Sequence, residues 1–245
     1  MASRVDGRPL ERCDEFAGQR HLLGDPDETG AGDPLLRRII ESGALTSLLF
    51  HGPPGTGKTT LARVIANATD RTFVAENAAS VGVKRIREII DEGVRRLQDS
   101  GRRTILFLDE IHRFTKSQQD VLLKDVELGR ITLIGATTEN PMFAVNSALV
   151  SRSTVFRLEA LDGPDIARVL RMAIDDPERG YGALKLTVAD DAMAHWARMS
   201  DGDARRALNA LEVAVLSSGT TPDAPIDIDL ATAEQSIQRK AILYD

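Results

Sequence analysis

The sequence has little of what marks secreted or membrane proteins. Cys13 is the only cysteine among 245 residues, so no disulfide can form within the chain. A single thiol is typical of proteins from reducing compartments. No run of about 18 apolar residues occurs, and the first residues contain no apolar signal-peptide core. We therefore expect a cytoplasmic protein with no membrane partner.

An excess of positive charge is also missing. The chain has 31 lysines and arginines against 37 aspartates and glutamates, which gives a formal net charge of −6. Such a chain has no overall attraction to nucleic acid, so any DNA contact must come from a local basic surface or from assembly. The composition is otherwise ordinary, with 42% hydrophobic and 28% charged residues, and it suits one large domain or two smaller ones.

Apolar strands alternate with amphipathic helices over the first two thirds of the chain. This alternation predicts an α/β fold, a parallel five-stranded sheet with helices on both faces. Strands are expected at 45–52, 72–77, 103–111, 131–138 and 153–158. Helices are expected before the first strand, at 34–43, and between the strands, at 58–69, 83–101 and 116–129.

The pattern changes after residue 158. Four helical segments follow, at 164–174, 190–200, 202–217 and 230–242. We therefore predict a nucleotide-binding domain over 1–158 and a small all-α lid domain over 159–245. Residues 1–34 are rich in Gly, Asp and Pro, and we expect this segment to be partly mobile.

A glycine-rich loop predicts nucleotide binding. The segment GPPGTGKT matches G-x-x-x-x-G-K-[ST], follows an apolar strand and opens a helix, which is the context that the phosphate loop requires. Backbone N–H groups would surround the phosphates, Lys58 would reach the β- and γ-phosphates, and the Thr59 hydroxyl would ligate Mg²⁺. The expected ATP-binding residues of the loop are Gly52, Pro53, Pro54, Gly55, Thr56, Gly57, Lys58, Thr59 and Thr60.

Two acidic residues close the third predicted strand. The segment TILFLDE places Asp109 and Glu110 directly after an apolar run. Ligands of open parallel sheets bind at the carboxyl ends of the strands, so the pair should lie beside the phosphate loop. We expect Asp109 to hold Mg²⁺, directly or through water, and Glu110 to polarise the attacking water. The alternative is a pair of acids that only ends a strand at the surface.

The histidines and the tryptophan have simpler interpretations. Hydrolysis at a phosphate loop needs no imidazole, so we expect a structural or interface role for His112, which follows the acidic pair. His195 and Trp196 lie in an amphipathic helix, and core packing is expected for both.

Several segments together resemble one family. LFHGPPGTGKTTLARVIAN, FLDEIHRFTKSQQDVLL, ITLIGATTENPMFAVNSALVSRSTVF and DGDARRALNALE come in the order of AAA+ ATPases. Their SR and GD-x-R elements are similar to the clamp-loader side of that superfamily. In detail the chain resembles the replication-associated recombination protein A family, which is related to the Werner helicase-interacting protein. Members of this family continue into an assembly domain, so we expect this chain to be an ATPase core with its lid.

The resemblance implies further site residues. Thr138 is at the sensor-1 position, where it would hold the attacking water or the γ-phosphate; Thr137, which points to the opposite face, is the alternative. Arg205 matches the sensor-2 arginine of the lid. Arg152 lies between two serines with no carboxylate in its own segment, and it matches the arginine finger that acts on a neighbouring subunit's ATP; a local salt bridge is the alternative. The segment around Gln19 and Leu22 resembles the part that packs on adenine, with His21 and Leu23 as further candidates.

The function that this resemblance implies is ATP hydrolysis, with Mg²⁺, in replication-fork maintenance, recombination and repair. The expected partners are DNA ends, forks or single-stranded regions, a single-strand-binding protein or a sliding clamp, and further copies of the chain, although the core alone could be monomeric. The location would be cytoplasmic, at the nucleoid. Two alternatives stay open: an ATP-switched clamp-loader-like scaffold, and a Holliday-junction branch-migration motor. The residues Lys84, Arg85 and Arg87 could contact DNA or form a solvated helix face.

Overall fold

A computed structural model of the chain describes residues 15–24, 33–218 and 224–237. Much of the expected mobile segment 1–34 lies outside these residues, as do Cys13 and the end of the last expected helix. The described residues up to Glu159 form one compact unit and those from Ala160 onward form a second. The domain boundary expected after residue 158 falls within one residue of this division. No helix in these described ranges is long and apolar enough to cross a bilayer.

The first unit is built on the predicted five-stranded parallel sheet. Its strands run in the order β2-β3-β4-β1-β5, so the carboxyl ends of all five lie at one edge. The central strands β1, β3 and β4 are almost wholly buried because helices cover both faces. The bounds are β1 Ser47–His51, β2 Thr72–Asn77, β3 Thr104–Asp109, β4 Thr132–Thr137 and β5 Ser153–Arg157.

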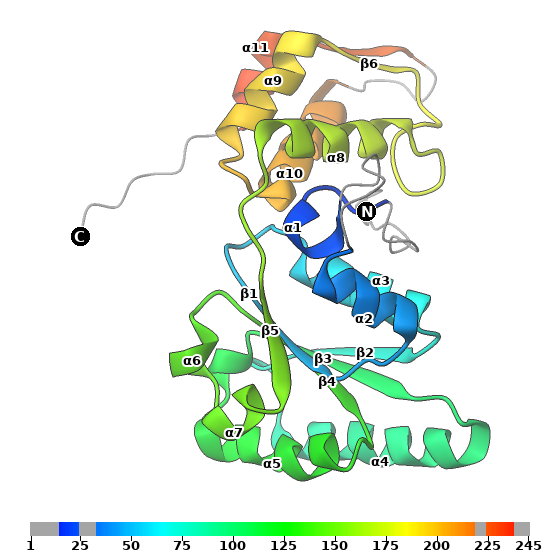
Figure 1. The fold of residues 1–245 in the computed structure, drawn as a ribbon. Helices are drawn as coiled ribbons and strands as arrows, with labels where there is room; N and C mark the ends of the chain where they lie inside the picture. Colours follow the sequence, from blue (N-terminus) through cyan, green and yellow to red (C-terminus); the bar gives the residue numbers. More distant parts are fainter. Residues whose placement is uncertain (1–14, 25–32, 219–223, 238–245) are drawn as a thin grey trace. The chain divides into compact units, whose positions relative to one another are not determined.

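The helices of this unit divide between the two faces of the sheet (Figure 1). Helices α1 to α3 pack on one face, and α4 and α5 pack on the other. Short turns of helix, η2, α6 and α7, follow the ends of β3 and β4. The bounds are α1 Arg20–Leu23, α2 Leu35–Ser42, α3 Lys58–Ala68, α4 Val83–Ser100, η2 Ile111–Arg113, α5 Lys116–Glu127, α6 Pro141–Ala144 and α7 Ser147–Val150.

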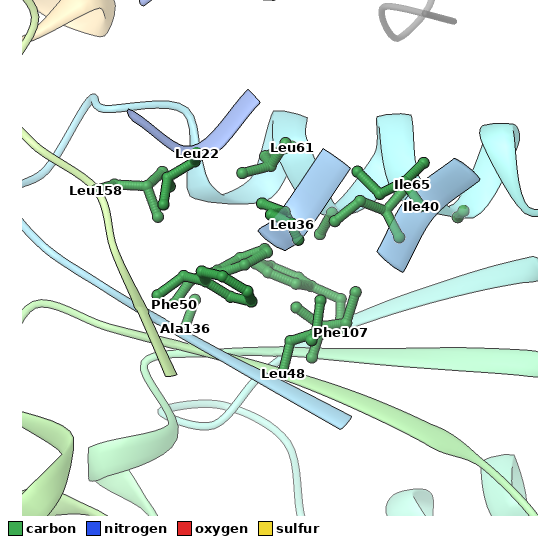
Figure 2. Packing of buried hydrophobic residues seen from close by; sticks show 14 of the residues in the cluster. Leu22, Leu36, Ile40, Leu48, Phe50, Leu61, Ile65, Phe107, Ala136 and Leu158 are labelled. Atoms are coloured by element: carbon green, nitrogen blue, oxygen red, sulfur yellow. The ribbon is translucent and has the colours of Figure 1, made fainter. Parts of the chain in front are cut away.

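Alternation along each central strand supplies both faces of the core. Leu48 and Phe50 of β1 face α2 and α3, as Figure 2 shows, whereas Leu49 belongs to the cluster under α4 and α5. The first cluster includes Leu36, Ile40, Leu61 and Ile65. Each buried side chain of this size contributes about 1.5–3 kcal/mol, so the two clusters hold the strand ends, and hence the site, in place.

The second unit is mainly helical, as predicted, around the fully buried Trp196. Its helices are α8 Gly163–Asp175, α9 Asp190–Met199, α10 Ala204–Ser218 and α11 Leu230–Ser236. It also contains a two-stranded parallel sheet that the sequence analysis did not predict, formed by β6 Leu186–Val188 and β7 Ile226–Ile228. Three-residue strands are too short to show an alternating pattern, which explains why an all-α lid was expected.

Candidate active site

The phosphate loop connects β1 to α3 and is closed by hydrogen bonds between its own residues. Lys58 is buried, and its Nζ donates hydrogen bonds to the carbonyl oxygens of Gly52 at 2.8 Å and Pro53 at 2.7 Å. The Thr56 hydroxyl donates to the Pro53 carbonyl at 3.0 Å. These bonds close the loop around the ammonium group, so a positive charge and the amino end of α3 face the same space.

Two glycines of the loop cannot be replaced without movement. Gly52 has φ 144°, and a Cβ there would lie 2.1 Å from the carbonyl oxygen of Leu158. Gly57 has φ 92°, and its Cβ would lie 2.6 Å from Cζ of Phe16. Both positions need glycine for the backbone angle and for the close approach of a neighbour. Phe16, which the sequence analysis did not single out, therefore forms part of the wall of the loop.

The acidic pair lies where the third strand ends. Asp109 is the last residue of β3, and its Oδ1 accepts a hydrogen bond from the Glu110 N–H at 3.0 Å. Glu110 adopts the left-handed conformation, with φ 53° and ψ 41°. Non-glycine residues rarely adopt this conformation, and it is found disproportionately at functional sites. The carboxyl edge of the sheet thus carries both the phosphate loop and a carboxylate in an uncommon backbone conformation.

The Glu110 side chain is paired with His112. Its Oε2 lies 3.0 Å from Nε2 of the imidazole, and Nδ1 of the same ring lies 2.9 Å from the Thr137 hydroxyl. Thr137 is fully buried and also accepts a hydrogen bond from the Glu139 N–H at 3.0 Å. Thr138, the next residue, is exposed. The hydroxyl of Thr137 is therefore already engaged, while Thr138 is an exposed residue.

The residues expected to hold Mg²⁺ fit a site in which phosphates and water supply most ligands. Thr59 lies in the first turn of α3 and is only partly exposed. Asp109 uses Oδ1 for the Glu110 N–H, which leaves Oδ2 as a hard oxygen ligand. Within the described part of the chain no group of three or more His, Cys, Asp or Glu side chains is arranged to bind a metal ion. Thr59 and Asp109 stay predictions as magnesium ligands.

The residues expected near adenine have partners within the protein. Gln19 is buried, and its amide bonds to both the carbonyl oxygen and the N–H of Glu159, at 2.7 and 2.9 Å. His21 bonds through Nε2 to the Arg157 carbonyl at 2.9 Å, and Leu22 lies in the core. These contacts attach α1 to the segment that follows β5. Adenine binding by Gln19 and Leu22 stays a prediction.

Arg152 has a carboxylate partner that its own segment does not supply. Its Nε lies 2.6 Å from Oε1 of Glu127, at the end of α5, and its Nη1 donates to the Ala148 carbonyl at 2.9 Å. The two charged side chains are 40% and 46% exposed. The local salt bridge that was the alternative to an arginine finger is thus present. Because both side chains are exposed to solvent, breaking this ion pair costs little free energy.

The lid places Arg205 on an exposed part of α10. The side chain lines a hollow of the lid together with Asp203, Asn209 and Ser236. Asp203 accepts a hydrogen bond from the Arg206 N–H, and this bond fixes the start of the helix. Trp196 is in the lid core as predicted, whereas the prediction for His195 was wrong, since this residue is half-buried and contacts Arg198 one turn away.

The electrostatics of the loop act on His51 at the end of β1. Burial lowers the pKa of His51, and the nearby positive charges of Arg157 and Lys58 lower it further. The imidazole is therefore neutral in the folded protein near pH 7. Positive charge is concentrated on this side of the strand end, as a site for a polyphosphate requires.

The basic residues at the start of α4 are only partly available. Arg85 is bound by three carboxylates, with Glu76 at 3.2 Å and Glu88 and Glu92 at 3.6 Å. Lys84 and Arg87 are exposed and have no hydrogen-bonding or ion-pair partner among the residues that the structure describes. A DNA contact from this helix would therefore use Lys84 and Arg87 before Arg85.

The phosphate loop after β1, the acidic pair at the end of β3 and the helical second unit define an ATPase of the AAA+ class. Residues 48–159 match the ATPase family associated with various cellular activities, and residues 182–245 match the AAA C-terminal domain. Within this class the chain is similar to members of the replication-associated recombination protein A family. It is 50% identical over 213 residues to the member named Replication-associated recombination protein A in Escherichia coli K12, and 40% identical over 234 residues to that in Bacillus subtilis.

The alignments cover most of this chain but only about half of each relative. The two alignments cover 87% and 96% of this chain but 45% and 53% of the relatives, so the chain spans about half their length.

Among solved structures, the Thermotoga maritima RuvB Holliday junction branch migration motor has a similar fold. Its TM-score is 0.64 at 22% identity, over 93% of this chain and 71% of that one. At this identity the likeness concerns the fold alone.

Proposed function

We propose that this chain is the ATPase part of a DNA-associated enzyme that acts at stalled or broken replication forks and in recombination and repair. The observation that carries the proposal is the identity of 50% over most of the chain to Replication-associated recombination protein A. The protein would work in the cytoplasm, at the nucleoid. Its task would be to remodel DNA ends or a protein bound to them.

The chemistry would be carried by the edge of the sheet. Lys58 and the loop amides bind the phosphates, and Thr59 and Asp109 hold Mg²⁺, which would neutralise charge on the phosphate oxygens. Glu110 orients and polarises the attacking water. Lys58→Ala should abolish nucleotide binding or turnover. Glu110→Gln should retain ATP and leave only a small residual rate of cleavage, and normal turnover by this variant would remove Glu110 from its role.

Two residues would report the state of the nucleotide. Thr138 would hold the water or the γ-phosphate, and the exposure of its side chain beside the engaged Thr137 supports it over its neighbour. Arg205 would reach the γ-phosphate from the lid. Loss of that contact after hydrolysis would change the angle of the lid, a hinge motion.

Arg152 would complete the site of a neighbouring subunit. A finger supplied to another subunit requires a head-to-tail contact, which closes into a ring or continues as a spiral. The test is the ATPase rate as a function of protein concentration, with and without DNA ends. A rate that rises faster than linearly supports sites shared between subunits, whereas strict proportionality over the whole range would contradict them.

DNA binding would use the start of α4, where Lys84 and Arg87 are exposed. Salt-dependent binding of single-stranded DNA should weaken in a Lys84→Glu, Arg87→Glu variant. The matched control makes the same charge change at two arginines paired on the surface, Arg102→Glu with Arg130→Glu. Equal losses in both variants would show a general charge effect and no contact at α4.

The first alternative is an ATP-switched scaffold that remodels a sliding clamp or a single-strand-binding protein. The ligand that stimulates ATPase activity distinguishes the two: DNA ends in the first case, the protein partner in the second. The second alternative, a branch-migration motor, has the fold of RuvB in its favour. Unwinding of a four-way junction by the protein would support that alternative.

A further inference from the structure

The imidazole of His112 connects two parts of the site that are far apart in the sequence. Nε2 lies 3.0 Å from Oε2 of Glu110, and Nδ1 lies 2.9 Å from the hydroxyl of Thr137 at the end of β4. The His112 side chain is only 9% exposed, against 33% for Glu110. The ring is thus held inside the protein, while the carboxylate that it binds faces outward.

The donor and acceptor capacities of the three side chains give each of these hydrogen bonds a direction. A carboxylate can only accept, so Nε2 carries the proton toward Glu110. When the ring carries its single proton on Nε2, Nδ1 accepts a hydrogen bond from the Thr137 hydroxyl, whose oxygen accepts from the Glu139 N–H at 3.0 Å. The Glu139 carboxylate also lies 3.7 Å from Nε2, so two carboxylates and the Thr137 hydroxyl surround the ring.

One oxygen of the glutamate stays available. Only Oε2 of Glu110 contacts His112, and Oε1 has no partner among the residues that the structure describes. A water molecule that attacks a phosphate needs one such carboxylate oxygen as its acceptor. Binding of Oε2 fixes the plane of the carboxylate, and hence the direction of Oε1, in a residue whose backbone is already in the left-handed conformation.

We propose that His112 is the positioning residue of this ATPase, which orients the carboxylate of Glu110 and couples it to the end of β4 through Thr137. Thr138 follows Thr137 directly, so a shift of the sensor segment when the γ-phosphate leaves is transmitted to the imidazole and from there to Glu110. The inference rests on the role proposed for Glu110. It replaces the interface or purely structural role that the sequence suggested for His112.

Two substitutions of His112 by amide side chains test the two contacts of the imidazole one at a time. His112→Asn places its amide near Nδ1, so it can keep the contact with Thr137 but loses Glu110. His112→Gln reaches the position of Nε2, so it keeps a donor for Glu110 but loses Thr137. We expect the asparagine variant to lower kcat roughly 10- to 100-fold and the glutamine variant about 2- to 10-fold, with KM for ATP within about twofold in both.

The measurements are steady-state and single-turnover ATP hydrolysis by the purified protein, with melting temperature recorded for each variant. His195→Gln, on the lid helix α9, is the matched control and should leave both constants unchanged. Adding His112→Asn to Glu110→Gln should lower the remaining single-turnover rate by less than about twofold, because groups that act as a unit are not additive.

Three results would overturn the inference. The first is a kcat of His112→Asn within about twofold of the unchanged protein. The second is a parallel fall in melting temperature and rise in KM in both variants, which marks a structural residue. The third is a full further loss in the double variant. If Glu110→Gln itself turns over normally, the role of Glu110 fails first, and the proposal for His112 fails with it.

Discussion

The exposed ion pair between Arg152 and Glu127 allows a sharp test of the arginine finger. An ion pair with both partners about half exposed contributes about 0.2–1 kcal/mol to stability. For a chain of this size, loss of that amount lowers Tm by about 4 °C at most. A finger that stabilises the charge on a transferring phosphoryl group contributes on the order of 10³ to 10⁵ in rate. The two roles therefore predict effects of very different size.

We expect Arg152→Ala to lower turnover roughly 10³-fold or more while Tm changes by no more than about 4 °C. Glu127→Gln should keep turnover or raise it by up to about fivefold, because the arginine no longer has to leave its partner. Turnover is measured at a protein concentration where the rate per subunit has reached its plateau, and Tm is measured in the same buffer.

The position of the finger in a neighbouring subunit is tested by mixing. Arg152→Ala and Lys58→Ala proteins are inactive alone, but a mixed assembly contains sites with an intact phosphate loop and an intact finger, so some activity should return. Absence of any rescue would argue against action between subunits. If the Arg152→Ala and Glu127→Gln variants lose turnover and stability equally, Arg152 serves only its structural ion pair with Glu127 and is not an arginine finger.

Further substitutions test the loop, its electrostatics and the lid. Gly52→Ala puts a Cβ 2.1 Å from the Leu158 carbonyl oxygen, so we expect the free energy of unfolding, measured with urea, to fall by about 3 kcal/mol or more. Nucleotide binding, measured with a fluorescent ATP analogue, should be lost as well. The pKa of His51 is lowered in the folded state, so the unfolded chain binds the proton more readily and the free energy of unfolding falls as pH drops below about 6.5. In the His51→Gln variant the midpoint of urea unfolding should therefore depend less on pH between about pH 5 and 7. The same pH dependence in the variant and the unchanged protein would contradict this. Trp196→Phe removes the hydrogen bond from Nε1 to Ser236 Oγ at 2.9 Å and should cost about 1–2 kcal/mol in calorimetry, whereas no loss would show that the bond is replaced by water.

Much of the sheet could be predicted because its signals are local. Continuous apolar runs mark β1, β3 and β4, since both sides of these strands are buried. The phosphate loop could be predicted equally well, because its glycines, Lys58 and Thr59 lie close together in the chain and each has its own role in binding phosphate or Mg²⁺. The short strands β6 and β7 gave no such signal, since they have three residues each.

The contacts across the carboxyl edge of the sheet depend on the tertiary structure. His112 and Thr137 are 25 residues apart, and only the pairing of β3 with β4 brings them within 2.9 Å. Glu127 meets Arg152 for the same kind of reason, since α5 ends beside the turn before β5. The sequence alone determined the loop, the acidic pair and the class of chemistry, because these are consecutive residues. Which side chains orient Glu110 and hold Arg152 was decided by the packing of distant segments, which no local pattern records.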